Sequence, residues 1–222
     1  MRPPVFFSSL LPLSLGLIAG PCLGQSEGAA SSALSGDFRQ ATWGMSKAEV
    51  LEAEANAPRG VREQDGEEIV TFASKLAGID ASVVYIFAKD QLVRAKYFLT
   101  TEHVDPNDFI ADYRSIEPLL KKCYGEPTET RAVWEEGSLQ SEPIVYLDRD
   151  RATPLDILPS DLFVGLDVAS GHLKLLSQWR DGRTEIMHAL TGLNGKIVHQ
   201  IEYVSTDLVA LEDQVRPKSA EP

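Results

Sequence analysis

The first amphipathic segment of the chain begins within the stretch WGMSKAEV, residues 43–50. Ser46 and Glu49 have the spacing of a capping box, in which the serine oxygen accepts from a first-turn N–H and the glutamate reaches back to the cap. Apolar residues then recur at helical spacing, at Ala48, Leu51 and Ala55. The pattern predicts a helix that starts after Ser46 and is stopped by Pro58 and Gly60.

After this helix the apolar positions become alternating or continuous, which is typical of strands. Strands are expected near Glu68–Ala73, Ile79–Ala88 and Gln91–Thr100. The short turn Lys89-Asp90 joins the last two as a β-hairpin. In its second arm, alternation predicts one face with Val93, Ala95, Tyr97 and Leu99, and an opposite face with Leu92, Arg94, Lys96 and Phe98.

A second helix is indicated at Asp105-Pro106, an N-cap residue followed by a proline suited to the first helical position. Its apolar stripe runs through Phe109, Tyr113, Ile116 and Leu120 towards Cys123. Pro118 lies inside this run and is expected to kink it or to begin a new turn, because proline lacks an N–H. Gly125 can end the helix in the left-handed conformation.

The second half then repeats the change to strand patterns. Strands are expected near Glu129–Trp134, His172–Arg180, Arg183–Leu190 and Lys196–Val204. Two tight turns, Asp181-Gly182 and Asn194-Gly195, join the last three as a meander. The stretch from Glu135 to Leu162 is rich in Pro, Asp and Glu, and one strand is predicted within it, at Ile144–Leu147.

Together these elements predict an α+β fold made of two weakly repeated helix-plus-antiparallel-sheet units, with the helices packed on one face of the sheet. A single domain is expected over residues 37–206, with halves 37–104 and 105–206. A flexible linker, residues 25–36, precedes this domain, and a polar C-terminal tail, residues 207–222, follows it.

The N-terminal residues have the layout of a secretory signal peptide. Arg2 precedes an apolar stretch too short for a transmembrane helix, and small residues follow it up to a cleavage site between Gly24 and Gln25. The alternative is a lipid anchor at Cys22, although a proline stands where a lipoprotein has a small residue. Either version predicts a bacterial protein that is periplasmic or secreted.

Net charge narrows the classes of partner. The chain has a formal charge of −12, which becomes −13 without residues 1–24 because they contain Arg2 and no acid. An acidic protein without a basic cluster is repelled by nucleic acid and by anionic lipid surfaces. Nucleic-acid binding is therefore not expected, and membrane association is expected only through an anchor at Cys22.

The stretch WGMSKAEV, the proline-glycine stop and the hairpin arm QLVRAKYFL resemble outer-membrane assembly lipoproteins of the SmpA/OmlA (BamE) type and β-lactamase-inhibitor-like modules. This resemblance covers residues 42–99. The segments LKKCYGEPTET, QWRDGRTEI and HQIEYVS are also similar to an uncharacterised family of exported bacterial proteins. Both resemblances imply location and fold, and the first implies a binding role. The chain departs from the lipoprotein pattern in its long second half and its ANAPRG helix exit.

Motifs of metal and catalytic sites are missing from the sequence. There is no HExxH, His-x-His, CxxC, GxSxG, GxGxxG or Walker pattern. His188 and His199 lie on neighbouring predicted strands and could approach each other, although partly solvated histidines are the simpler expectation. No cofactor, catalytic residue or metal ligand is predicted. If Cys22 is removed with a signal peptide, Cys123 has no disulfide partner within the chain.

Carboxylates are plentiful but are interrupted by arginines. The acids of one loop region are Asp148, Asp150, Asp156 and Asp161. Because Arg149 and Arg151 interrupt them and no EF-hand spacing is present, solvated loop charges are expected, with a weak Ca²⁺ site at residues 148–161 as the alternative. The pair Glu67-Glu68 is expected at the surface.

The tryptophans provide the remaining pointer to a site. Trp and Arg are frequent at the energetic centres of protein interfaces, although Trp is equally a core residue. The candidate binding residues are Trp43, Trp134, Trp179, Arg180 and Arg183. A sheet face that carries Lys174, Gln178 and Arg180 beside Arg183 would suit a protein or peptide partner.

The sequence thus favours a non-enzymatic protein-interaction or envelope-assembly module with a protein or peptide partner in the cell envelope. Two alternatives remain, a small-molecule or metal-ion binding protein and a hydrolase with an unrecognised site. The first predicts a concave apolar pocket with a few polar groups. The second predicts a nucleophile and a base within hydrogen-bond reach.

Overall fold

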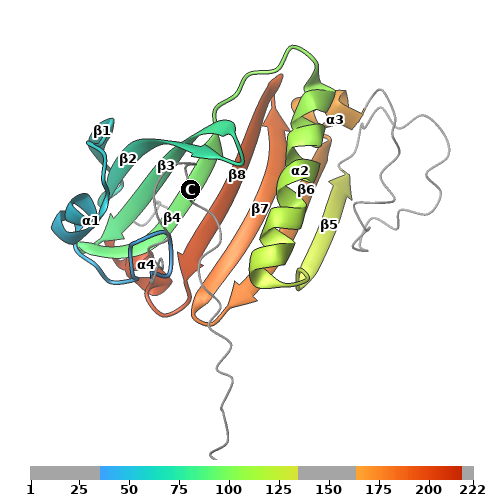
Figure 1. Ribbon diagram of the computed structural model, residues 1–222. Coiled ribbons are helices and arrows are strands. Elements are labelled where there is room, and N and C mark those ends of the chain that lie inside the picture. Colours follow the sequence, from blue (N-terminus) through green and yellow to red (C-terminus); the bar gives the residue numbers. More distant parts are fainter. Residues whose placement is uncertain (1–35, 135–163, 217–222) are drawn as a thin grey trace, which may run out of the picture.

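The fold is built on one antiparallel sheet of eight strands in the order β1-β2-β3-β4-β8-β7-β6-β5 (Figure 1). The computed structural model describes residues 36–134 and 164–216. The α+β class predicted from the sequence is confirmed. The predicted signal peptide with its Gly24–Gln25 cleavage site, Cys22, the linker, the strand at 144–147 and the acidic loop at 148–161 lie outside the described residues.

The first half contains α1 (Lys47–Ala53) and the strands β1 (Gly60–Gln64), β2 (Glu67–Leu76), β3 (Ile79–Ala88) and β4 (Gln91–Leu99). The predicted capping box is present: the Ser46 side chain accepts from the Glu49 N–H, and the Glu49 carboxylate accepts from the Ser46 N–H at 2.8 Å. The Lys89-Asp90 turn has positive φ at both residues, as a two-residue hairpin requires. Strand β1, whose side chains are all exposed, was not predicted, because it has no apolar alternation.

Helix α1 ends five residues before Pro58, earlier than the sequence suggested, because Glu54 leaves the helix in an extended conformation. Its carboxylate turns inward and accepts hydrogen bonds from the Tyr85 hydroxyl and from Arg39. The free energy of these buried contacts outweighs the local preference to continue the helix.

The predicted faces of β4 are partly wrong. Ala95 and Tyr97 point into the core and Arg94 points away from it, as expected, but Leu92 lies on the core side. A register irregularity between Ile86 and Phe87 explains this, because it leaves Val93 opposite no partner residue. An extra residue of this kind, a β-bulge, reverses the alternation on one side of the bulge.

The second half contains α2 (Pro106–Tyr124), β5 (Glu129–Trp134), α3 (Val164–Ser170), β6 (Leu173–Asp181), β7 (Thr184–Leu193) and β8 (Lys196–Ser205). The Asp105 cap is confirmed, and α2 continues through Pro118. Gly125 is the C-cap residue, as expected, and its φ of +79° is positive. Its ψ of −165° differs from the expected left-handed conformation. Helix α3 was not predicted. It packs so closely that a Cβ on Gly192 of β7 would lie 1.8 Å from the Val168 carbonyl oxygen, so only glycine fits there.

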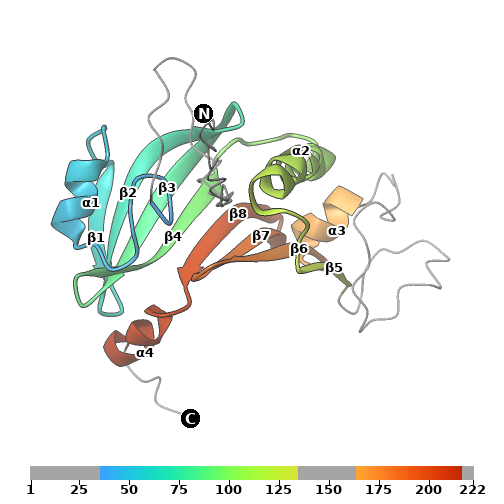
Figure 2. The ribbon, with the colours of Figure 1, turned by 60° about the horizontal axis from the view of Figure 1, so that its bottom comes forward.

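The core lies on the face of the sheet that α2 and α3 cover (Figure 2). A larger apolar cluster joins α1, the N-terminal segment and β2–β4 to β8 and part of α2. It includes Phe38, whose ring centroid lies 5.2 Å from that of Tyr97 and 4.8 Å from that of Tyr203. A smaller cluster lies between α2, α3 and β5–β7. We call this covered face the core face and the opposite face the outer face.

The sequence predicted that the helices pack on one face of the sheet, but one helix does not pack on the core face. The C-terminal helix α4 (Glu212–Val215), preceded by a 3-10 turn at Val209–Leu211, lies away from α2 and α3 (Figure 2). Its Glu212 is buried and accepts two hydrogen bonds from Arg94, an outer-face residue of β4. Residues 209–215 are therefore ordered by a buried ion pair, whereas the sequence predicted a polar tail.

Replacing Ser46 with alanine should lower the free energy of unfolding by about 0.5–2 kcal/mol, because it removes the side-chain acceptor of the α1 cap. Urea unfolding of the two proteins measures the difference. Ser115→Ala is the matched control, since this exposed serine lies inside α2 and its hydroxyl donates to the Asp112 carbonyl oxygen, so it caps no helix start. Equal unfolding midpoints for wild type and Ser46→Ala would contradict the assignment of the cap.

Candidate functional site

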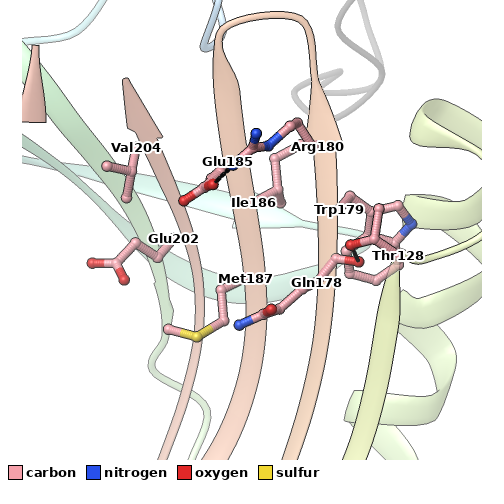
Figure 3. A pocket seen from close by; sticks show the side chains of 9 residues that line it. All are labelled: Thr128, Gln178, Trp179, Arg180, Glu185, Ile186, Met187, Glu202 and Val204. Atoms are coloured by element: carbon pink, nitrogen blue, oxygen red, sulfur yellow. Dashed lines mark hydrogen bonds and ion pairs between the residues drawn. The ribbon is translucent and has the colours of Figure 1, made fainter. Parts of the chain in front are cut away.

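The outer face of β6–β8 contains a hollow of about 410 Å³, which we call the β6–β8 hollow (Figure 3). Its lining residues are Thr128, Gln178, Trp179, Arg180, Glu185, Ile186, Met187, Glu202 and Val204. Arg180 pairs with Glu185 across β6 and β7, and Gln178 stands opposite Met187 in the next row. The surface is thus a mixture of charged, amide and thioether side chains, with no described helix among the lining residues.

Two of the predicted site residues, Trp179 and Arg180, line this hollow, but they contribute differently. The Arg180 side chain is exposed, whereas Trp179 retains only 2% exposure and directs its ring into the core. The Trp179 indole N–H donates to the Gly125 carbonyl oxygen at 2.9 Å, which fixes the end of α2 on β6. Trp179 is therefore a packing residue, and Arg180 is the accessible one.

Trp43 and Arg183 lie together at another place, where the N-terminal segment meets the β6–β7 turn. The Trp43 indole N–H donates to the Thr184 hydroxyl at 2.9 Å, and its backbone N–H donates to Asp37 at 2.8 Å. Arg183 donates to the same Asp37 carboxylate at 2.7 and 3.1 Å. These contacts hold the two halves of the chain together across the sheet.

Trp134, the fifth predicted residue, lies at the end of β5 and packs against the smaller core cluster. Its indole N–H is buried and has no hydrogen-bond partner among the described residues. The structure therefore does not bring the three tryptophans into one patch. The hollow residues that sequence reasoning missed include Met187, Glu202 and Val204, because strand alternation reveals a shared face only after the pairing of β7 with β8 is known.

A network of buried charges forms the border of the hollow at β8 and β4. Arg94 donates to both carboxylate oxygens of Glu212, at 2.7 and 2.6 Å, and to Glu202 at 2.7 Å. Lys96 pairs with Glu202 at 2.6 Å. Arg216 pairs with Glu212 at 3.1 Å and with Glu67 at 2.8 Å, so Glu67 is buried and the expected surface position is wrong.

Charge pairing decides the protonation of this ionic network. Burial acts to raise the pKa of the Glu202 carboxyl, but the hydrogen bonds from Lys96 and Arg94 outweigh it and hold that pKa below the ordinary value. Burial likewise acts to lower the pKa of Arg94, and its bonds to Glu212 and Glu202 raise it. Glu202 and Arg94 are therefore both charged at neutral pH.

A second polar cluster is buried beneath α2. The Nε2 atoms of His188 and His199 lie 2.8 Å apart, so one imidazole donates to the other. The Tyr113 ring stacks on His188 with centroids 3.9 Å apart, and its hydroxyl lies 3.0 Å from the Ser177 hydroxyl. Ser177 in turn donates to Glu117 at 3.2 Å. The two histidines therefore meet across β7 and β8, but the expectation that they are partly solvated is wrong.

Desolvation dominates the electrostatics of this buried histidine pair. Burial lowers the pKa of His188 to about 3 and that of His199 to about 3, so both rings are neutral at neutral pH. Burial also raises the pKa of Glu117. The Nδ1 atom of His188 lies 3.5 Å from the Glu117 carboxylate without hydrogen-bond geometry, and both histidine Nδ1 atoms lack hydrogen-bond partners among the described residues.

Ser177 and Glu117 come nearest to the nucleophile-and-base arrangement of a hydrolase. Ser177 has no exposed surface, however, and His188 faces Glu117 and His199, with no hydrogen bond to the serine. A substrate cannot reach this oxygen in the folded structure. In the described part of the chain, no group of three or more His, Cys, Asp or Glu side chains is placed to hold a metal ion. Cys123 packs at the edge of the larger core cluster.

Comparison of the chain with protein-family models, with curated proteins and with solved structures found no match. No helix among residues 36–134 and 164–216 is long and apolar enough to cross a membrane.

Proposed function

We propose that this protein is an exported, non-enzymatic interaction module of the bacterial cell envelope, with a periplasmic or secreted location. The observation that carries the proposal is the β6–β8 hollow on the outer face, where accessible Arg180, Gln178 and Met187 lie side by side. Arg and Met are enriched at protein interfaces relative to the rest of the surface. The partner class proposed is a protein or peptide.

Several features support binding over catalysis. The hollow combines an Arg180–Glu185 pair at its rim with Met187 and Val204, a composition suited to an adaptable polar and apolar contact. The groups best placed for proton transfer, Glu117 and the buried histidine pair, lie on the core face beneath α2 and so away from the hollow.

We also infer that the two halves are repeated units. Each half contains a helix followed by four antiparallel strands that pair in chain order, and the last strands, β4 and β8, pair in the centre of the sheet. The second half adds α3 between β5 and β6. In the pairing of β4 with β8, Lys96 stands opposite Glu202, Ala95 opposite Tyr203 and Tyr97 opposite Ile201. The hairpins β3–β4 and β7–β8 both close with two-residue turns at positive φ, which is a further similarity between the halves.

Photocrosslinking in cells tests the proposed function. A photoreactive residue placed at Gln178 or at Met187 should give an adduct with the same envelope protein, while one at the fully exposed Val104, in the loop before α2, should not. Arg180→Glu should lower the adduct yield about tenfold, as expected when an arginine that contacts the partner is lost. The crosslinked protein should begin at Gln25.

Two results would contradict this proposal. The first is an adduct from Val104 that matches those from Gln178 and Met187, since contact would then not depend on the hollow. The second is a protein that keeps residues 1–24 and remains in the cytoplasmic fraction, because an envelope partner would then be out of reach.

A further inference from the structure

A second hollow, of about 300 Å³, lies on the outer face of the first half, and we call it the β1–β4 hollow. Its lining residues are Arg62, Gln64, Asp65, Glu67, Ile69, Val84, Ile86, Arg94, Lys96, Phe98 and Arg216. The ionic network separates it from the β6–β8 hollow, because Arg94 and Lys96 line one and their partner Glu202 lines the other.

The floor of this hollow is apolar. Ile69 of β2 and Val84 and Ile86 of β3 lie in outer-face rows and form an apolar cluster separate from both core clusters. Phe98 of β4 packs against it. The exposures of Ile69, Val84 and Ile86 are only 6–8%. The room for a narrow apolar group is given by the hollow of about 300 Å³ that these residues line.

The end of the C-terminal segment contributes Arg216 to the wall of the hollow. Arg216, the residue that follows α4, bonds Glu67 at the start of β2. The β1–β2 turn fits tightly against α4, since a Cβ on Gly66 would lie 2.4 Å from the Val215 carbonyl oxygen. The hollow is thus closed at this end by a wall that the buried Glu212 holds in place.

The lining of the hollow is rich in basic residues, in contrast to the strongly acidic chain as a whole. Four basic side chains line the hollow, Arg62, Arg94, Lys96 and Arg216, against two acids, Asp65 and Glu67. Arg94, Lys96 and Arg216 are engaged by glutamates of the ionic network. Arg62 is exposed and makes no ion pair or side-chain hydrogen bond with another described residue, so its guanidinium is available to a ligand.

We propose that the β1–β4 hollow binds a single-chain amphiphile with an anionic head, such as a medium-chain carboxylate. The chain lies on Ile69, Val84, Ile86 and Phe98, and the carboxylate accepts hydrogen bonds from Arg62 at the rim, where a planar guanidinium matches a carboxylate. The volume, at the lower end of the range for ligand pockets, fits one narrow chain. This site is independent of the protein partner proposed for the β6–β8 hollow.

Titration calorimetry of the purified protein with sodium decanoate, below its micelle concentration, tests the proposal. Decanoate should bind one site, while decyltrimethylammonium, which has the same chain and the opposite charge, should bind at least tenfold more weakly. Arg62→Glu should weaken decanoate about tenfold. Arg114→Glu, the same charge reversal at an exposed position on α2, should leave the decanoate affinity unchanged.

Three results would overturn the proposal. These are the absence of decanoate binding, equal affinity for the two decyl compounds, and equal affinity of wild type and Arg62→Glu for decanoate. Sedimentation of the same samples tests for a fourth contradicting result. This is a dimer that persists in decanoate and that Arg62→Glu dissociates, because a second copy of the chain would then occupy the hollow. None of these results alters the crosslinking expected at Gln178 and Met187.

Discussion

Arg94→Met should lower the free energy of unfolding by about 3–5 kcal/mol at neutral pH, because it removes the buried cation that bonds both Glu202 and Glu212. Glu202 and Glu212 have side-chain exposures of only 9% and 2%, and Arg94 provides three hydrogen bonds to them. Lys96 remains paired with Glu202 and Arg216 with Glu212, so a value near the lower end is expected. Methionine keeps most of the aliphatic volume, which isolates the effect of the charge.

Lys75→Met is the matched control for this substitution. Lys75 pairs with Asp80 at 2.5 Å, but both side chains are about two-thirds exposed, so its loss should cost no more than about 1 kcal/mol. Urea unfolding of the three proteins gives the comparison. A double variant, Arg94→Met with Glu212→Leu, should regain part of the stability, because one of the orphaned charges is removed with the arginine. An equal, small loss for Arg94→Met and Lys75→Met would show that the network does not hold α4.

Acidification from pH 7.5 to 5 should lower the free energy of unfolding through the buried histidine pair. In the folded protein the pKa of each ring is lowered to about 3, whereas an unfolded histidine titrates near 6.5. Between these values the unfolded chain binds protons that the folded protein does not, so stability is complete above the unfolded pKa and decreases as pH falls. By pH 5 the expected loss is about 2 kcal/mol per histidine.

The groups that face the pair modify this slope and define the control variants. Glu117 acts in the opposite direction and increases stability as pH falls. Its pKa is raised in the folded protein, which therefore binds this proton at a higher pH than the unfolded chain does. Tyr113 and Ser177 provide hydroxyls, and Asp112 raises the pKa of His199 slightly. His199→Gln keeps an amide donor towards His188 and should remove about half of the slope. His172→Gln, a half-buried histidine outside the pair, should keep it. Identical slopes in all three proteins would exclude the buried pair as the source.

The first half of the chain shows how far local patterns reach. Ser46 and Glu49 predict the start of α1, and Lys89-Asp90 predicts the β3–β4 hairpin, because both depend on residues adjacent in sequence. The same holds for the Asp105 cap and for the Asn194-Gly195 turn. The orientation of Leu92 towards the core does not follow from the alternation of β4, because the bulge at Val93 depends on the register in which β4 pairs with β3.

The candidate sites follow the same division. Gln178 and Arg180 could be assigned to one face of β6 from alternation alone. Whether that face is exposed to solvent depends on where α2 and α3 pack. Trp179, which was expected at a binding surface, instead holds the end of α2 through its hydrogen bond to Gly125. Glu67, Glu202 and Glu212 look like ordinary surface acids in the sequence, and only the pairing of β4 with β8 and the return of α4 bring arginines to them.

The sequence by itself therefore determined the elements, their caps and turns, the α+β class and the expectation of export, because each depends on neighbouring residues or on composition. The tertiary structure decided which strands meet in the centre of the sheet, which charged and histidine side chains are buried, and where the outer face forms hollows. These properties depend on contacts between residues such as Arg94 and Glu212, or His188 and His199, whose proximity is set by the packing of the whole sheet.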